Sequence, residues 1–207
     1  VKYGVDGLRI NPGNIGNEQK VKEIVKACND ANISIRIGVN SGSIKKEYLE
    51  KYNGVNENSI VESALEQVNL LESLNFNNIK ISLKASSVPL TIESYKKMSE
   101  IVDYPLHLGV TEAGTPWRGT IKSSIGIGAL LSMGIGDTIR VSLTSDPIEE
   151  VRVGKEILKS LGLRKEGLTL ISCPTCGRTK INLIKLAEEV EKALDHIDKP
   201  LTVAIMG

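Results

Sequence analysis

Two cysteines separated by two residues are the first feature of the sequence that could do chemistry. Cys173 and Cys176 lie in LISCPTCGRT (170–179), after a short apolar run and before a helical pattern. Such a pair can form a redox disulfide, or it can supply half of the ligands of a zinc or iron–sulfur site. A metal site needs further ligands, and the two histidines, His107 and His196, lack ligand spacing to the pair. Spacing alone favours a redox dithiol and leaves both metal sites open.

A series of cations forms the second group. Arg9, Arg36, Lys84 and Arg140 stand at equivalent places on four strand-like segments, with His107 on a fifth. Cations brought together inside a protein lose hydration and repel one another, and few acidic side chains share their face. Arginine offers planar paired donors that suit phosphate. We expect an anionic ligand, with ion pairs to carboxylates on other strands as the alternative.

Further polar groups accompany these cations. The stretch NPGNIG (11–16) is rich in turn residues, and its backbone N–H groups could also contact a phosphate. Glu112 and His107 flank the end of one strand-like segment and are possible proton-transfer groups. The neutral residues expected to add hydrogen bonds to the same ligand are Asn11, Asn40, Ser142 and Thr144.

The elements that must position these residues alternate along the chain. Alternating strands and helices, with most strands spaced by roughly 30 residues, predict parallel strands with right-handed crossovers. Gly126 and Gly128 resemble a nucleotide-binding glycine turn, but they precede a strand instead of following one, so a helix is expected there. The expected strands are 5–10, 34–39, 78–83, 106–110, 137–143, 168–172 and 201–206. The expected helices are 17–31, 59–74, 91–102, 123–137, 147–161 and 181–194.

The first five strand segments are apolar on one face only. In IRIGVN (35–40), isoleucine and valine alternate with arginine, glycine and asparagine, and the other four follow the same pattern. A strand of an open doubly wound sheet has helices on both faces and is apolar on both. A barrel with a polar interior mouth fits the alternation better. The alternative is a sheet with one face in water, which parallel sheets rarely adopt.

A (β/α)8 barrel has eight strands in ~250 residues, whereas five suitable strands precede a change of character near residue 150. The predicted fold class is α/β, the last five strands of a (β/α)8 TIM-type barrel followed by a second domain. We assign residues 1–150 to the barrel, and residues 151–207 to a connecting helix and the start of the second domain. The chain opens without an initiator Met, and we expect three strands upstream.

The composition is that of a soluble globular protein, with 41% hydrophobic and 25% charged residues. The net charge of +1 favours neither nucleic acid nor a membrane surface as a partner. No apolar run approaches the ~20 residues of a membrane span. Three cysteines do not suggest a secreted disulfide framework, so we expect a cytoplasmic protein in which Cys28 is a buried apolar residue.

Six motifs in order carry a specific resemblance. They are LRINPGNIG, IRIGVNSGS, ISLKAS, HLGVTEAG, GIGDTIRVSLT and ISCPTCGR. Together they resemble the 4-hydroxy-3-methylbut-2-enyl diphosphate synthase family, from near Val5 to the last residue. The resemblance implies a (β/α)8 barrel followed by a small α+β domain that carries a 4Fe–4S cluster. It also implies reductive ring opening and dehydroxylation of 2-C-methyl-D-erythritol 2,4-cyclodiphosphate in the methylerythritol phosphate route to isoprenoids.

The resemblance further implies flavodoxin or ferredoxin as electron donor and a homodimer in which the cluster domain of one subunit covers the barrel of the other. It gives Glu112 a role in proton transfer, and it makes Cys173 and Cys176 two of the four cluster ligands. The other two ligands, a Cys and a Glu, are expected beyond Gly207. The substrate-binding positions that it implies are Arg9, Asn11, Arg36, Asn40, Lys84, Thr111, Arg140 and Ser142.

Two other functions are kept open. One is a barrel that binds a phosphate ester and uses the Cys-x-x-Cys pair as a redox dithiol, without a cluster. The other is a non-catalytic module, although an open five-stranded piece would expose sheet edges and half of its core. We therefore expect the 207 residues alone to be inactive.

Overall fold

The computed structural model describes residues 1–11 and 18–207. It divides the chain into unit 1, Val1–Ile157, and unit 2, Leu158–Gly207. Most of the turn predicted at 11–16 to contact phosphate lies outside the described residues. The predicted boundary between residues 150 and 151 falls inside helix α6 (Pro147–Ser160).

The strands of unit 1 are parallel and follow one another in chain order. β1 (Gly7–Ile10), β2 (Ser34–Asn40) and β3 (Ile79–Lys84) form one sheet in that order. β4 (His107–Leu108) pairs with β5 (Thr138–Ile139), and a bridge between Ile81 and Leu106 links the two sheets. The prediction of an α/β fold with parallel strands is confirmed.

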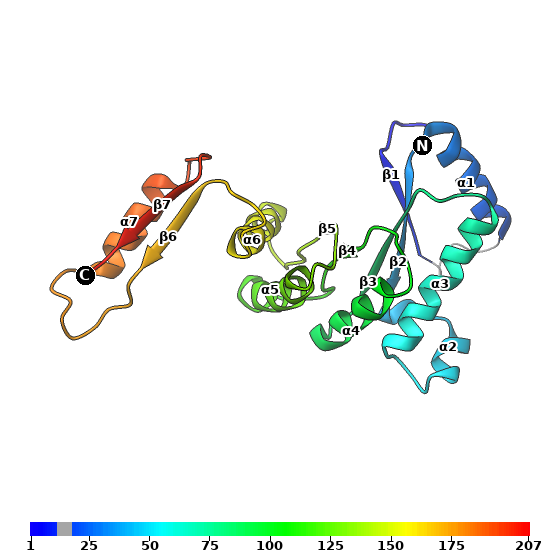
Figure 1. Ribbon diagram of the computed structural model, residues 1–207, viewed down its shortest axis with the longest axis horizontal. Coiled ribbons are helices and arrows are strands. Elements are labelled where there is room, and N and C mark those ends of the chain that lie inside the picture. The colour runs from blue at the N-terminus through cyan, green and yellow to red at the C-terminus, as the bar shows by residue number, and fades with distance from the viewer. Residues whose placement is uncertain (12–17) are drawn as a thin grey trace. The chain divides into compact units, whose positions relative to one another are not determined.

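Helices connect these strands, and Figure 1 shows α1 and α3 lying together on one side of the sheet β1–β3. α4 packs against β3 and α3, and α5 packs against α4. Six helices are described in this unit and its boundary: α1 (Glu18–Ala31), α2 (Lys46–Lys51), α3 (Glu57–Ser73), α4 (Val88–Ser99), α5 (Pro116–Ser132) and α6 (Pro147–Ser160).

The apolar strand face forms the core, as the alternation predicts. Ile35, Ile37 and Val39 of β2 are fully buried, as is Ile81 of β3, and Leu83 of β3 is nearly so. Burying a side chain of this size stabilises the fold by roughly 1.5–3 kcal/mol. The opposite face of the same strands is therefore the one that carries the polar residues.

A tyrosine joins β3 to β4. The Leu83 N–H donates to Tyr95 Oη at 2.9 Å, and the Tyr95 hydroxyl donates to the His107 carbonyl at 2.5 Å. Two residues earlier on β3, the Ile81 N–H donates directly to the Pro105 carbonyl at 2.9 Å. The fully buried Tyr95 of α4 thus inserts its hydroxyl between two strands and satisfies a backbone group of each.

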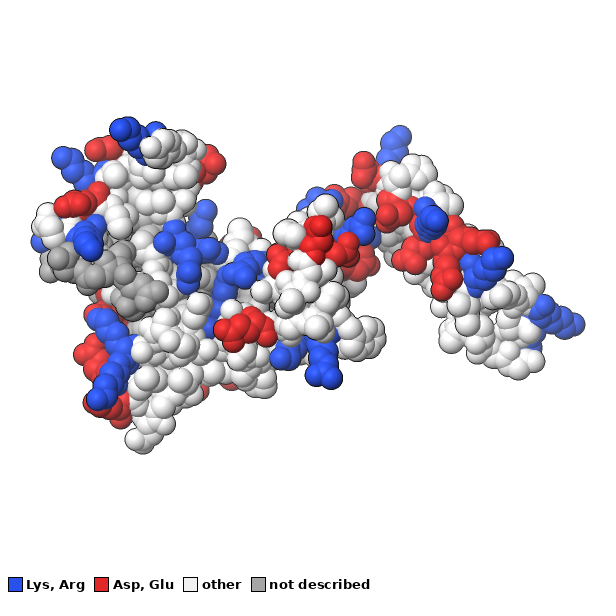
Figure 2. All heavy atoms as spheres, turned by 180° about the vertical axis from the view of Figure 1, so that it is seen from behind, with Lys and Arg blue, Asp and Glu red and all other residues white. Residues whose placement is uncertain are grey.

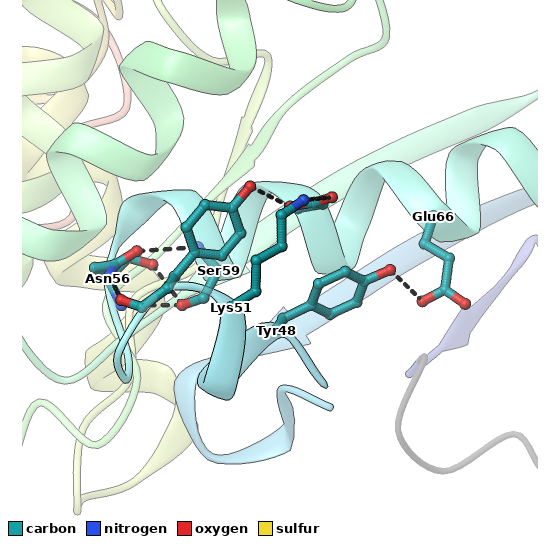
Figure 3. A network of polar contacts seen from close by, with 7 residues as sticks. Tyr48, Lys51, Asn56, Ser59 and Glu66 are labelled. Carbon is teal, nitrogen blue, oxygen red and sulfur yellow. Dashed lines mark hydrogen bonds and ion pairs between the residues drawn. The ribbon is translucent and has the colours of Figure 1, made fainter. Parts of the chain in front are cut away.

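A polar network fastens α2 to α3 (Figure 3). Tyr48 Oη donates to Glu66 at 3.0 Å, and Lys45 also contacts that carboxylate. Lys51 lies 2.6 Å from Glu62. Asn56 is the N-cap of α3, and its side chain accepts from the Asn58 and Ser59 N–H groups.

Several elements differ from the sequence-based prediction. α2 and the short 3₁₀ turn Ser41–Ser43 were not expected. β4 and β5 are shorter than the expected 106–110 and 137–143. α5 begins at Pro116, whose fixed φ suits a first helical turn, and it ends at Ser132 instead of continuing to 137. Gly134 and Gly136 follow with positive φ, a conformation that stops the helix.

Unit 2 is a single strand–helix–strand arrangement. β6 (Leu168–Ser172) and β7 (Leu201–Ile205) pair in parallel, and α7 (Leu183–Leu194) lies between them in sequence. Asn182 caps α7 by accepting from the Lys185 N–H at 3.1 Å. Across both units, none of the helices in the described ranges is both long and apolar enough to cross a membrane.

Candidate functional site

The strand register of unit 1 brings polar residues of neighbouring strands together. Arg9 of β1 pairs with Arg36 of β2, and Asn40 of β2 pairs with Lys84 of β3. All four belong to the face opposite the core, because side chains alternate along a strand. We call Arg9, Arg36, Lys84 and Arg140 the cation face. Figure 2 shows Lys and Arg side chains gathered over the strands of unit 1.

Lys84 is the most deeply placed of the four cations, with only 5% of its surface exposed. Burial, and then the positive charges of Arg140, Arg36 and Arg9, together lower its pKa to about 7. In residues 1–11 and 18–207, no carboxylate forms an ion pair with any member of the cation face. Carboxylates within the described residues thus leave the positive charge of this face uncompensated.

Arg36 shows the same effect in a half-buried position. Burial lowers its pKa, and repulsion from Arg9 and Arg140 lowers it further. Arg140 is exposed; its Nη2 donates to Ser142 Oγ at 3.2 Å, and its backbone N–H donates to Leu108 at 2.9 Å. This hydrogen bond ties the guanidinium to Ser142, two residues further along the chain.

His107 lies near these cations, but its imidazole is uncharged. Its Nδ1 is 2.8 Å from Thr138 Oγ1, and its Nε2 is buried with no hydrogen-bond partner in the described part of the chain. Burial, and then the charges of Lys84 and Arg36, lower its pKa to about 3. The imidazole is therefore neutral at physiological pH, so it is a poor general acid there.

Thr111 and Glu112 follow β4 at the carboxyl end of the strands. The Thr111 N–H donates to Ala85 at 3.1 Å and so joins the ends of β4 and β3. Glu112 is exposed and has φ of 52°, a left-handed conformation that costs a residue with a side chain roughly 1–2 kcal/mol. Strain of this kind is concentrated at functional sites.

Asn11 and Asn40 are half-buried at the ends of β1 and β2. The Asn40 N–H donates to Ser43 Oγ at 3.2 Å, and Ser43 Oγ donates back to the Asn40 carbonyl at 2.9 Å. This turn fixes the backbone where β2 ends. The predicted substrate positions therefore come together along β1–β5 and at their carboxyl ends.

The cysteine pair lies in unit 2, in the loop after β6. The Cys173 N–H donates to Ile205 at 3.1 Å, so the loop begins beside the end of β7. The Cys176 N–H donates to Thr179 Oγ1 at 3.1 Å. Hydrogen bonds from the Arg178 backbone and from Thr179 lower the pKa of the Cys176 thiol. Both thiols are free, and Cys176 is exposed.

These two thiols fit the donor chemistry of an iron–sulfur or zinc site, which binds the thiolate form. A lowered thiol pKa favours that form. No group of three or more metal-ligating side chains is found in the ranges that the structure describes. Within the described residues, the thiols that unit 2 could offer to such a site are therefore Cys173 and Cys176.

Two models of one protein family match the chain. The GcpE TIM-barrel domain matches residues 1–155, and the GcpE protein C-terminal domain matches residues 169–207. The chain belongs to the GcpE family. The resemblance stated from the six motifs is confirmed, and the strands of unit 1 are part of a TIM-barrel domain.

The GcpE chain is also similar to curated proteins named 4-hydroxy-3-methylbut-2-en-1-yl diphosphate synthase (flavodoxin). The protein from Caldanaerobacter subterraneus is 64% identical over all 207 residues, which are 58% of its length. The one from Clostridium tetani is 64% identical over the same residues, 59% of its length. The one from Geobacter sulfurreducens is 60% identical over 204 residues, 58% of its length. The chain thus spans less than two thirds of these relatives.

Sequence reasoning did not single out three residues that contribute to the structure of the candidate site. Gly38 lies under Arg9, Tyr95 ties β3 to β4, and the buried Ser82 donates to Ile37 at 3.3 Å. The alternation of polar and apolar residues assigned Gly38 and Ser82 to the polar face of the strands. It did not indicate a role for either residue, because both are small and common. Tyr95 lies on a helix, and nothing in the helical pattern points to a strand backbone.

Proposed function

We propose that the full-length protein containing this chain performs the reductive ring opening and dehydroxylation of 2-C-methyl-D-erythritol 2,4-cyclodiphosphate. Membership of the GcpE family and the names of relatives that are 58–64% identical support the proposal. The single observation that carries it within the structure is the cation face, four cations without a carboxylate partner in the described ranges.

The cation face would bind the diphosphate and fix its orientation. Arg36 and Arg140 offer paired donors that match phosphate oxygens, and Lys84 offers a point charge between them. Asn11, Asn40, Thr111 and Ser142 would add neutral hydrogen bonds at the carboxyl ends of the strands. Holding the diphosphate at several points would leave the carbon skeleton in a fixed position for reaction.

Glu112 would move a proton. Its carboxyl group is exposed on the turn after β4, one residue from Thr111. Loss of a hydroxyl group as water requires a proton donor, and a carboxyl group can serve once it is protonated. The neutral His107, with its low pKa, is less suited to the task.

Cys173 and Cys176 would hold a 4Fe–4S cluster, with the other ligands contributed from beyond Gly207. Bound there, such a cluster would pass on, one at a time, the two electrons that the reaction consumes and that an external donor supplies. The flavodoxin in the names of the relatives supports flavodoxin as electron donor, with ferredoxin as the alternative. The finer proposals are that unit 1 comprises the last five strands of a (β/α)8 barrel, that unit 2 begins the α+β cluster domain, and that the enzyme is a cytoplasmic homodimer.

Anaerobic reconstitution of the full-length protein tests this proposal. We expect about four irons per chain, with an absorption band near ~400 nm, and conversion of the cyclic diphosphate with a chemical reductant. Zinc bound without iron would contradict the proposal. Activity without iron, accompanied by a reversible disulfide between Cys173 and Cys176, would favour the redox-dithiol barrel instead.

A further inference from the structure

A glycine lies under one of the cations. Gly38 stands in the middle of β2, on the polar face between Arg36 and Asn40, and it is buried. The Arg9 side chain reaches across from β1, and its Nη2 donates to the Gly38 carbonyl at 3.1 Å. The guanidinium therefore lies against the β2 backbone at the one position of this strand that has no side chain.

The backbone does not require glycine here. Gly38 is not among the residues with positive φ, so an alanine could adopt the same conformation. Glycine weakens a strand interior, because it adds backbone entropy to the unfolded chain and offers nothing to pack. Its presence in a buried strand therefore calls for another explanation.

The space above Gly38 is occupied by Arg9. A methyl group at position 38 would overlap Nε of Arg9 and lie 3.1 Å from both Cζ and Nη2. The overlapping atoms belong to the outer part of a flexible side chain, so a methyl group would move the guanidinium before it moved the fold. Gly109 is different, because a methyl group there would lie 2.7 Å from the backbone carbonyl of Arg140.

We propose that Gly38 is a positioning residue for Arg9: the missing Cβ lets the guanidinium lie on β2 and thereby holds it in the cation face. The inference rests on the proposed function insofar as Arg9 is taken to bind the diphosphate. Position 38 then requires glycine because of the side chain of Arg9, and not because of the backbone conformation or the packing of β2.

The test is a double-mutant cycle in the full-length, cluster-loaded protein. The variants are Gly38→Ala, Arg9→Met and the double variant, and the measured quantity is the Kd of the cyclic diphosphate by calorimetry. Loss of one charge-assisted contact should weaken binding by about 10- to 100-fold in Gly38→Ala and at least as much in Arg9→Met. In the Arg9→Met background, Gly38→Ala should change Kd by less than about threefold, because the overlapping group is gone.

Gly128→Ala is the matched control. Gly128 lies on α5 with ordinary φ, and a methyl group there would contact nothing within 4 Å. This variant should bind like the parent protein. Should Gly38→Ala alone fail to fold, the double variant should restore the thermal transition, since its steric conflict is removed.

The outcomes distinguish a failure of the positioning role of Gly38 from a failure of the proposed diphosphate site. Equal Kd for Gly38→Ala and the parent, or effects of the two substitutions that simply add, would overturn the positioning role while leaving the proposed function intact. An unchanged Kd in Arg9→Met would instead remove Arg9 from the diphosphate site, and the inference about Gly38 with it. A double variant that also fails to fold would make Gly38 a structural residue.

Discussion

The two chemical regions of the chain are built in different ways. The cation face of unit 1 is carried by parallel strands whose other face is a packed core, and its most buried member, Lys84, is 5% exposed. The cysteine pair of unit 2 lies on a loop, with Cys176 exposed and the backbone held by bonds to Ile205 and Thr179.

The two sites differ in structure because the source of stabilisation differs between a group of cations and a pair of thiolates. Cations that repel one another need a rigid support before the anion arrives, because the sheet must offset their desolvation. Thiolates gain their energy from the metal itself, and metal sites couple binding to local ordering. Binding of the diphosphate and binding of iron should therefore respond to different substitutions.

The largest expected effect is the loss of the cluster. In the full-length protein, Cys173→Ser and Cys176→Ser should each lower activity by about 100-fold or more, because a ligand of the cluster is lost. Iron content should fall with activity, while the Kd of the cyclic diphosphate changes little. Cys28→Ala is the control, because Cys28 is fully buried in the core of unit 1. Loss of iron in that control, or full iron in the two serine variants, would undo the assignment.

A smaller effect, on binding alone, is expected at the cation face. Arg36→Met should weaken binding of the cyclic diphosphate by about 10- to 100-fold, with unchanged iron content. Lys46→Met is the matched control, since Lys46 is exposed and its ion pair in the described part of the chain is with its helical neighbour Glu50 at 3.5 Å. Parallel loss of iron and of binding in Arg36→Met would mean that the arginine is structural.

The third prediction concerns pH. The Lys84 pKa of about 7 in the ligand-free chain should rise when the diphosphate binds, because an anion favours the charged form. Below pH 7 both states are protonated and affinity should be flat; above it, affinity should fall by up to about tenfold per pH unit. Calorimetry between pH 6 and 9 measures this slope. Lys84→Arg should abolish it, and a parent protein with constant affinity over the range would argue against a buried Lys84.

The smallest effect is expected at the network between α2 and α3. Glu66→Gln weakens the contacts of Lys45 and Tyr48, whose network is partly exposed. Surface pairs of this kind contribute about 0.2–1 kcal/mol, so thermal unfolding should shift slightly while diphosphate binding and iron content stay constant. A clear loss of binding would extend the functional site to this network.

Much of the cation face could be predicted from the sequence. Alternation in strands such as 35–40 assigned the core and polar faces, and the register then brought Arg9 beside Arg36 and Asn40 beside Lys84. The period-2 pattern is set by backbone geometry, so it can be recognised in the sequence without knowledge of the tertiary fold. The same pattern could not tell where pairing stops, and β5 is only Thr138–Ile139.

Other features could not be predicted, because they depend on tertiary contacts and not on a pattern in the local sequence. The helix α2 spans six residues, too few to produce a helical periodicity. The role of Tyr95 depends on the distance between two strands, and that of Gly38 depends on the path of an arginine from the neighbouring strand. The role of the cysteine pair stays a prediction, because its spacing does not distinguish a cluster from a dithiol and the described residues hold no larger group of metal-ligating side chains.

The most direct test of the cation face as the diphosphate site is a crystal structure of the full-length protein with the cyclic diphosphate bound. We expect phosphate oxygens about 2.7–2.9 Å from the nitrogens of Arg36, Lys84 and Arg140. A structure in which these cations pair with carboxylates from other strands, and the phosphates lie elsewhere, would contradict the account.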